Sequence, residues 1–142
     1  MHYLGLAFLC LPVVLLAQQK DSLRLSCMLN NAVEHFEKQS SFSGQKELKI
    51  VLTSPTDTLV KAPTDVVIST LQRDEEGRWD VVFYHKDYWF WLSGISKPTV
   101  RKDQKLRTGD PIGVLATGQK IELLIYDFET PVDPAKYMNC GK

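Results

Sequence analysis

Histidine and cysteine, the residues that most often bind a metal or act in catalysis, are scarce in this chain. Three histidines and three cysteines occur among 142 residues, with no Cys-x-x-Cys spacing and no histidine cluster. A zinc site built on cysteine is therefore not expected, because such a site needs four ligands at close spacing. His85 and Asp87 form a His-x-Asp pair at the end of an apolar stretch, and we expect a structural role for His85.

An apolar run at the N-terminus predicts a secretory signal peptide. Residues 4–17 read LGLAFLCLPVVLLA, without a charge, and a helix that crosses a bilayer needs about 20 such residues. Polar residues follow at once, so we expect cleavage after Ala17 and export to the periplasm or the extracellular space. A buried N-terminal strand or helix is the alternative. No transmembrane span is expected in residues 18–142.

The two cysteines of the mature chain, Cys27 and Cys140, lie near its two ends. An even number of cysteines in an exported chain permits a disulfide, which here would link the two ends of the domain. Two separate thiols are the alternative.

The overall charge excludes two classes of protein. Lys plus Arg and Asp plus Glu number 17 each, hydrophobic residues make up 44%, and the pI is about 6.8. A nucleic-acid binder would show a cationic excess, and a disordered chain would show low hydrophobicity with a high net charge. The length allows one domain with one core.

The hydrophobic pattern predicts one helix followed by strands. Apolar residues at helical spacing follow good N-cap residues and predict an amphipathic helix over 21–39. After Gly44 the pattern changes to short apolar segments separated by turn residues, typical of strands; they cover 48–52, 58–61, 66–71, 79–84, 88–92, 112–116 and 121–128. We expect a mainly β fold, an antiparallel β-sandwich or partly open barrel with one N-terminal α-helix. The expected division is a signal peptide over 1–17, helix and linker over 18–44, and a β domain over 45–142.

Five segments of the β domain occur in the order found in one peptidase family. They read VKAPTDVV at 60–67, DVVFYH at 80–85, KDQKLRTGDPIG at 102–113, TG at 117–118 and PVDPAKYM at 131–138. This order resembles the lysostaphin/LytM-type family of zinc metallopeptidases, which cleave peptidoglycan. Carrier domains with a related Gly-Asp turn are a fold-level alternative, but Lys86, between His85 and Asp87, fits poorly as their modified lysine.

The resemblance implies a degenerate metal site. The family's zinc ligands and catalytic histidines come from an H-x-x-x-D pair, an H-x-H strand and one further strand histidine, and a bound water supplies the nucleophile. The matching positions here are occupied by Glu47, Val51, Gly94, Lys120 and Glu122. We therefore expect that zinc is lost, that no cofactor replaces it and that the chain is inactive as an enzyme.

The replaced positions suggest an ionic cluster in place of the metal. Lys120 and Glu122 lie on one face of a strand, because side chains alternate with a period of two, and Glu47 is expected on the neighbouring strand. These three groups would form the cluster, and ordinary solvated charges are the alternative. Glu47 and Glu122 alone would bind a hard cation only weakly.

The sequence Tyr88-Trp89-Phe90-Trp91 places two aromatic pairs on opposite faces of one strand. One pair should lie in the core. We expect the predicted N-terminal helix to cover Trp89 and Trp91; the alternative is that these two line a groove where indoles stack on sugar rings or contact a protein.

From the resemblance we expect a non-catalytic exported module. Its expected partner is peptidoglycan, a cell-wall amidase or a divisome protein. A nucleic-acid partner is not expected. An active or unorthodox metal-dependent endopeptidase is the alternative, although no residue offers a tuned base or a nucleophile.

Overall fold

The computed structural model describes residues 22–35 and 48–140 of the chain. The predicted signal peptide and Glu47 lie outside these residues. The described residues are mainly β, and their elements are β1 (Leu25–Ser26), β2 (Val33–His35), β3 (Ile50–Thr53), β4 (Leu59–Lys61), β5 (Val66–Arg73), β6 (Trp79–His85), β7 (Tyr88–Ile95), β8 (Lys97–Pro98), β9 (Lys105–Leu106), β10 (Pro111–Val114), β11 (Ile121–Asp127), β12 (Thr130–Val132), the 3-10 helix η1 (Pro134–Lys136) and β13 (Met138–Asn139). In the described ranges, none of the helices is long and apolar enough to cross a membrane.

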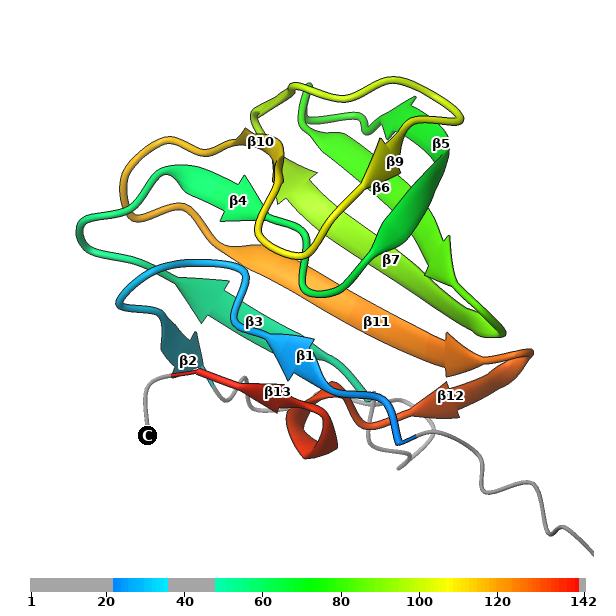
Figure 1. The fold of residues 1–142 in the computed structure, drawn as a ribbon. Helices are drawn as coiled ribbons and strands as arrows, with labels where there is room; N and C mark the ends of the chain where they lie inside the picture. The colour runs from blue at the N-terminus through cyan, green and yellow to red at the C-terminus, as the bar shows by residue number, and fades with distance from the viewer. Residues whose placement is uncertain (1–21, 36–47, 141–142) are drawn as a thin grey trace, which may run out of the picture.

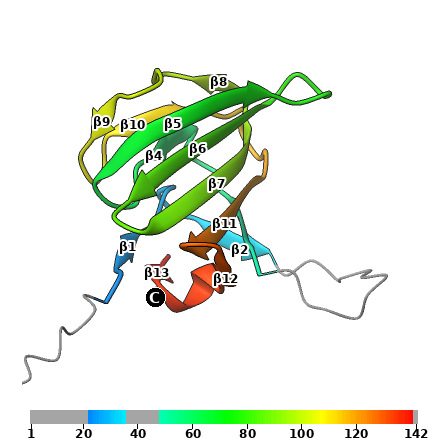
Figure 2. The same ribbon diagram turned by 90° about the vertical axis from the view of Figure 1, so that its right-hand side faces the viewer.

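Most strands belong to one antiparallel sheet, which we call the main sheet. Seven of its eight strands follow the order β2-β3-β11-β7-β6-β5-β9, and β12 also pairs with β11. A second sheet has the order β4-β10-β8, and β1 pairs in parallel with β13. The two antiparallel sheets pack against each other and do not close into a barrel (Figures 1 and 2). The expected mainly β class is confirmed.

Alternating side chains explain why the main sheet buries one face. Tyr88, Phe90 and Leu92 of β7 are buried, whereas Trp89 and Trp91 between them are exposed. Phe90 stacks on Phe83 of the neighbouring β6, with ring centroids 5.1 Å apart. Side chains of the small sheet complete this cluster. Burying each of these apolar side chains stabilises the fold by about 1.5–3 kcal/mol. The core therefore determines which face of the main sheet remains exposed.

The predicted helix over 21–39 is wrong for residues 22–35, which form β1, a turn and β2. Residues 21 and 36–39 lie outside the described part. Leu25, Met28 and Leu29, whose spacing suggested a helix, are instead buried in the common core. Pairing with distant strands overrides the local pattern, since Leu25 N–H donates to the Tyr137 carbonyl and the Met28 carbonyl accepts from Lys61 N–H.

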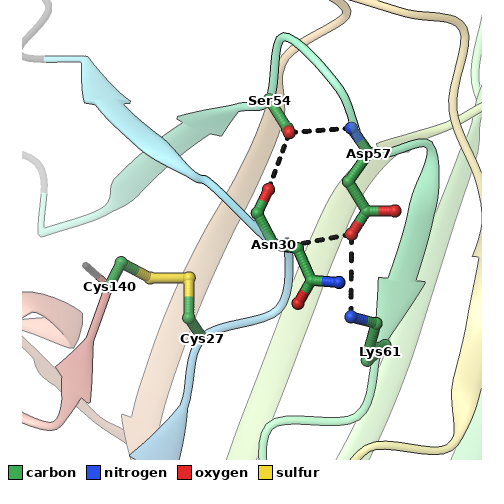
Figure 3. Close-up of a disulfide and its surroundings, with 6 residues drawn as sticks. All are labelled: Cys27, Asn30, Ser54, Asp57, Lys61 and Cys140. Atoms are coloured by element: carbon green, nitrogen blue, oxygen red, sulfur yellow. Dashed lines mark hydrogen bonds and ion pairs between the residues drawn. A yellow bond between two sulfur atoms is a disulfide. The ribbon is translucent and has the colours of Figure 1, made fainter.

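A disulfide joins the N-terminal segment to the C-terminal strand. Cys27 and Cys140 are bonded across 113 residues (Figure 3), so the structure contains the bridge that the sequence permitted. A cross-link stabilises mainly by restricting the unfolded chain, and the effect grows with the length of the loop that it closes.

A polar network on the same segment fixes it to the β3–β4 turn (Figure 3). The buried Ser54 hydroxyl donates to the Asn30 carbonyl at 2.7 Å and accepts from Asp57 N–H at 2.9 Å. The Asp57 carboxylate accepts from Asn30 N–H at 2.8 Å and from Leu59 N–H at 3.1 Å, and it lies 3.6 Å from Lys61 Nζ. Burial raises the pKa of Asp57, but these two N–H donors and the Lys61 ammonium outweigh it and lower the pKa below its usual value.

Candidate functional site

The outer face of the main sheet carries a row of residues that stand opposite one another on neighbouring strands. Val51 of β3 pairs with Glu122 of β11, Glu122 with Ser93 of β7, and Ser93 with Asp80 of β6. His35 of β2 pairs with Val51 at the end of this row. Side chains directly opposite in adjacent strands lie on one face of a sheet. We call these five residues the site row.

A cavity of about 590 Å³ opens beside the site row. Its lining includes three of the positions singled out in the sequence, Gly94, Lys120 and Glu122. Val51 is buried and stands opposite Glu122 without lining this cavity. The structure thus brings four of the five predicted positions to one region of the sheet; the fifth, Glu47, lies outside the described residues.

The turn between β5 and β6 supplies the other wall of the cavity through Asp74, Glu75, Glu76 and Arg78. The Asp74 carboxylate accepts from the N–H groups of Glu76 and Arg78 at 2.9 and 2.8 Å, so this side chain holds the turn itself. This turn contains the acidic run Asp-Glu-Glu at 74–76. Its place in the site was missed, because it depends on how far β5 and β6 extend along the sheet.

Glu122 forms an ion pair with a residue that the sequence did not single out. Its Oε1 lies 3.5 Å from Lys49 Nζ. The expected cluster combined Glu122 with Glu47 and Lys120; the structure places Lys120 on the same cavity and adds Lys49 as a charge partner. A lysine ammonium only donates hydrogen bonds, so this pairing occupies the carboxylate without creating a base–nucleophile pair.

Gly94 has no room for a side chain. It is the extra residue of a bulge, because Asp80 pairs with Ser93 while Trp79 pairs with Ile95. Its φ is +98°, and an added Cβ would lie 2.6 Å from the Lys120 carbonyl oxygen. A histidine at position 94, where the resemblance placed one, would clash with backbone. On β7, it is Ser93 whose side chain belongs to the site row.

The described residues at these positions do not fit zinc. Catalytic zinc needs three nitrogen, sulfur or carboxylate ligands and an open position. Val51 is apolar, Lys120 is a cation, Ser93 offers a hydroxyl, and the Glu122 carboxylate faces Lys49. Over 22–35 and 48–140, no group of three or more His, Cys, Asp or Glu side chains could hold a metal ion.

The two histidines in the described ranges, His35 and His85, make hydrogen bonds to neighbouring strands or loops. His35 Nε2 lies 2.6 Å from Thr53 Oγ1, and His85 Nδ1 lies 2.6 Å from the Asp65 carbonyl oxygen. The second contact ties the end of β6 to the start of β5, as a structural role requires.

Two further rows on the same outer face contain tryptophan. Trp91 stands between Leu124 and Val82, and Trp89 stands between Tyr126 and Tyr84. Trp89 is 38% exposed and Trp91 is 39% exposed. The expectation that an N-terminal helix covers them is wrong in the described structure, because the described part of that segment forms strands. We call Tyr84, Trp89, Trp91 and Tyr126 the aromatic strip.

Comparisons with known proteins give matches in structure and none in sequence. No protein-family model matches the chain. No curated protein matches it either. Among solved structures, Helicobacter pylori Csd3 matches with a TM-score of 0.65 and 13% identity over 84% of this chain and 36% of its own.

Two other matches have similar scores. The antimicrobial peptidase lysostaphin from Staphylococcus simulans matches with a TM-score of 0.63 and 17% identity over 82% of this chain and 54% of its own. A chain of the SpoIIQ–SpoIIIAH pore-forming complex matches with a TM-score of 0.62 and 12% identity over 82% of this chain and 92% of its own.

This chain therefore spans about a third of Csd3 and about half of lysostaphin. At these identities the likeness concerns the fold. The described residues have the fold of the lysostaphin/LytM-type peptidases.

Proposed function

We propose that this chain is an exported LytM-like domain that acts in the cell envelope without catalysis, by binding peptidoglycan or by regulating a cell-wall hydrolase. The observation that supports the proposal is a site that keeps its cavity and its row of facing residues while its donor groups are replaced. Val51 and Gly94 offer no ligand atom in their side chains, and Glu122 faces Lys49.

The chemistry of the site supports binding better than hydrolysis. Peptide hydrolysis in this fold needs an activated water, and activation requires a metal or a well-placed base. In the described cavity, the Glu76 carboxylate pairs with the Arg78 guanidinium at 3.3 Å, and the Asp74 carboxylate is engaged by amides of its own turn. Such a surface can hold a ligand through hydrogen bonds and charge.

The structural neighbours are compatible with a catalytic or a non-catalytic role for this fold. One is named as a peptidase and another belongs to a pore-forming complex. The fold alone therefore does not require catalysis, and the residues at the site decide.

The proposal is tested by incubating the purified protein with isolated sacculi, in parallel with lysostaphin as the active control. We expect the protein to release no muropeptides, with and without added zinc, and to contain no stoichiometric zinc by elemental analysis. Muropeptide release by this chain, or stoichiometric zinc, would overturn the proposal.

The same preparation separates the two modes of action. Co-sedimentation with sacculi that is not followed by turnover supports peptidoglycan binding. Stimulation or inhibition of a purified amidase on the same sacculi supports regulation. A protein that neither binds sacculi nor changes the activity of an amidase would contradict the proposed function.

A further inference from the structure

We propose that the aromatic strip binds the glycan strand of peptidoglycan by stacking Trp89 and Trp91 on the faces of its sugar rings. This inference rests on the proposed function and names the part of peptidoglycan that is recognised. It concerns the two rows that contain tryptophan, which lie next to the site row on the same face of the main sheet.

The strip presents its two tryptophans close together on one strand. Trp89 and Trp91 are two residues apart on β7, which separates their backbone positions by about 7 Å. Tyr126 of β11 and Tyr84 of β6 flank Trp89 at the two neighbouring strand positions, each about 5 Å away. Aromatic side chains therefore extend along β7 and across three strands.

Neighbouring side chains hold both indoles in position. The indole Nε1 of Trp91 donates to Asp80 Oδ2 at 3.2 Å. The ring of Trp89 lies 5.0 Å from the ring of Tyr84, tilted by 40°. A ring that is fixed before binding loses less conformational entropy when a ligand stacks on it.

The size of the exposed surface favours a sugar over a protein. Tryptophan side chains offer at most about 250 Å² each, so exposures of 38% and 39% leave on the order of 200 Å² for the pair. A stable protein interface buries about 800 Å² on each side. The other exposed large hydrophobic residues of the described ranges, Val33, Leu59 and Phe128, lie on other elements.

Polar groups around the strip suit hydroxyl-rich ligands. Asp80 and Glu122 place carboxylates in the adjacent site row, Ser93 stands between them, and Thr70 stands opposite Val82. Carboxylates accept hydrogen bonds from sugar hydroxyls, and Asp80 keeps acceptor capacity after accepting from Trp91 because each carboxylate has about four acceptor sites. Stacking in the middle with acceptors at the edge is the arrangement that a neutral pyranose needs.

The test is a titration of the purified protein with the tetramer of N-acetylglucosamine, followed by NMR of the tryptophan side chains. The chain has three tryptophans, and Trp79 is packed against the core, so it serves as the internal reference. We expect the indole N–H signals of Trp89 and Trp91 to shift in a saturable way, while that of Trp79 stays in place.

Variants then locate the site. Trp89→Ala and Trp91→Ala should each weaken binding about tenfold, whereas Trp91→Tyr, which keeps an aromatic ring, should retain most of it. Phe128→Ala is the matched control, because Phe128 is an aromatic residue 69% exposed in the β11–β12 turn, and binding should not change.

Three results would overturn the inference while leaving the proposed function intact. They are unshifted Trp89 and Trp91 signals, undiminished sacculus binding by the folded Trp89→Ala/Trp91→Ala variant, and binding of a free stem peptide in place of the sugar tetramer. Different results would contradict the proposed function: muropeptide release, stoichiometric zinc, or a protein that neither binds sacculi nor affects an amidase.

Discussion

Gly94 combines two constraints that occur separately at Gly109 and Gly113. Its φ of +98° is disfavoured for any side chain, and a Cβ would also meet the Lys120 carbonyl oxygen. Gly109 shares the positive φ, at +88°, but has open space around it. The two positions therefore separate the cost of backbone conformation from the cost of a clash.

We expect Gly94→Ala to lower the free energy of unfolding by about 2–4 kcal/mol, because conformational strain and overpacking add. Gly109→Ala, the control, should cost only about 1 kcal/mol. Chemical denaturation measures both values. Equal losses for the two variants would show that the backbone near Lys120 adjusts at no cost.

Asp57 makes the stability of the fold depend on pH. Because its pKa is lowered in the folded state, the ionised carboxylate stabilises the protein above the pKa of the unfolded chain, about 4. That stabilisation is lost as the pH falls through the lower folded pKa.

Asp57→Asn should therefore reduce the free energy of unfolding by about 1–2 kcal/mol at pH 7, and the difference from the unmodified protein should shrink as the pH falls below about 4. Denaturation at a series of pH values measures it. Asp103→Asn, at an exposed turn residue, is the control and should show little change at any pH. A difference that stays constant down to pH 3 would contradict this role for Asp57.

Three adjacent strands of the main sheet give the site row the spacing of a possible ligand set. Val51, Glu122 and Ser93 are directly opposite in register, so ligands at these positions would have Cβ atoms about 5 Å apart between neighbours. The register of these described strands therefore places three side chains side by side on one face.

We expect the variant Val51→Asp/Ser93→His/Glu122→His to bind zinc stoichiometrically in equilibrium dialysis, because it supplies two imidazoles and a carboxylate on one face. The matched variant Val51→Asp/Gly94→His/Glu122→His should bind far less, since position 94 clashes with the backbone. Equal zinc binding by both variants would show that the register does not determine the site.

The strands of four or more residues and the three-residue β4 could be predicted from sequence, whereas the two-residue strands could not. The predicted 79–84 and 88–92 correspond to β6 and β7, and 121–128 corresponds to β11, because each has enough alternating residues to show a period of two. β1, β8, β9 and β13 have two residues each. Such strands exist only through pairing with distant chain segments, so no local pattern marks them.

The site was predictable in part for the same reason. Lys120 and Glu122 were found through motif order and strand periodicity, and they do line one cavity. Lys49 and the Asp74–Arg78 turn were missed, because their place beside Glu122 follows from sheet register and strand length. The exposure of Trp89 and Trp91 was predicted incorrectly, since it depended on a helix that the described segment does not form.

At the scale of the whole molecule, the disulfide links segments from both ends of the described chain. Cys27 follows β1 and Cys140 follows β13, and these strands pair in parallel (Figure 1). The bridge therefore holds the N-terminal segment in the core that it shares with the main sheet.

We expect Cys27→Ser/Cys140→Ser to reduce the free energy of unfolding by up to about 4–5 kcal/mol, as the length of the closed loop implies. Urea denaturation measures the loss. The unmodified protein in reducing agent is the control and should match the variant. An unmodified protein that is insensitive to reduction would show that β1–β13 pairing suffices without the bridge.

The parallel pairing of β1 with β13 also determines the order in which the molecule can be completed. During synthesis, β1 is made before the strands of both larger sheets and β13 is made after them. The first strand must therefore wait for the last one, and Cys27 has a thiol without its native partner until Cys140 has been synthesised. Closure of the disulfide must follow synthesis of Cys140, and a nascent chain that stalls before this residue keeps Cys27 as a thiol, which distinguishes it from a chain in which the bridge has formed.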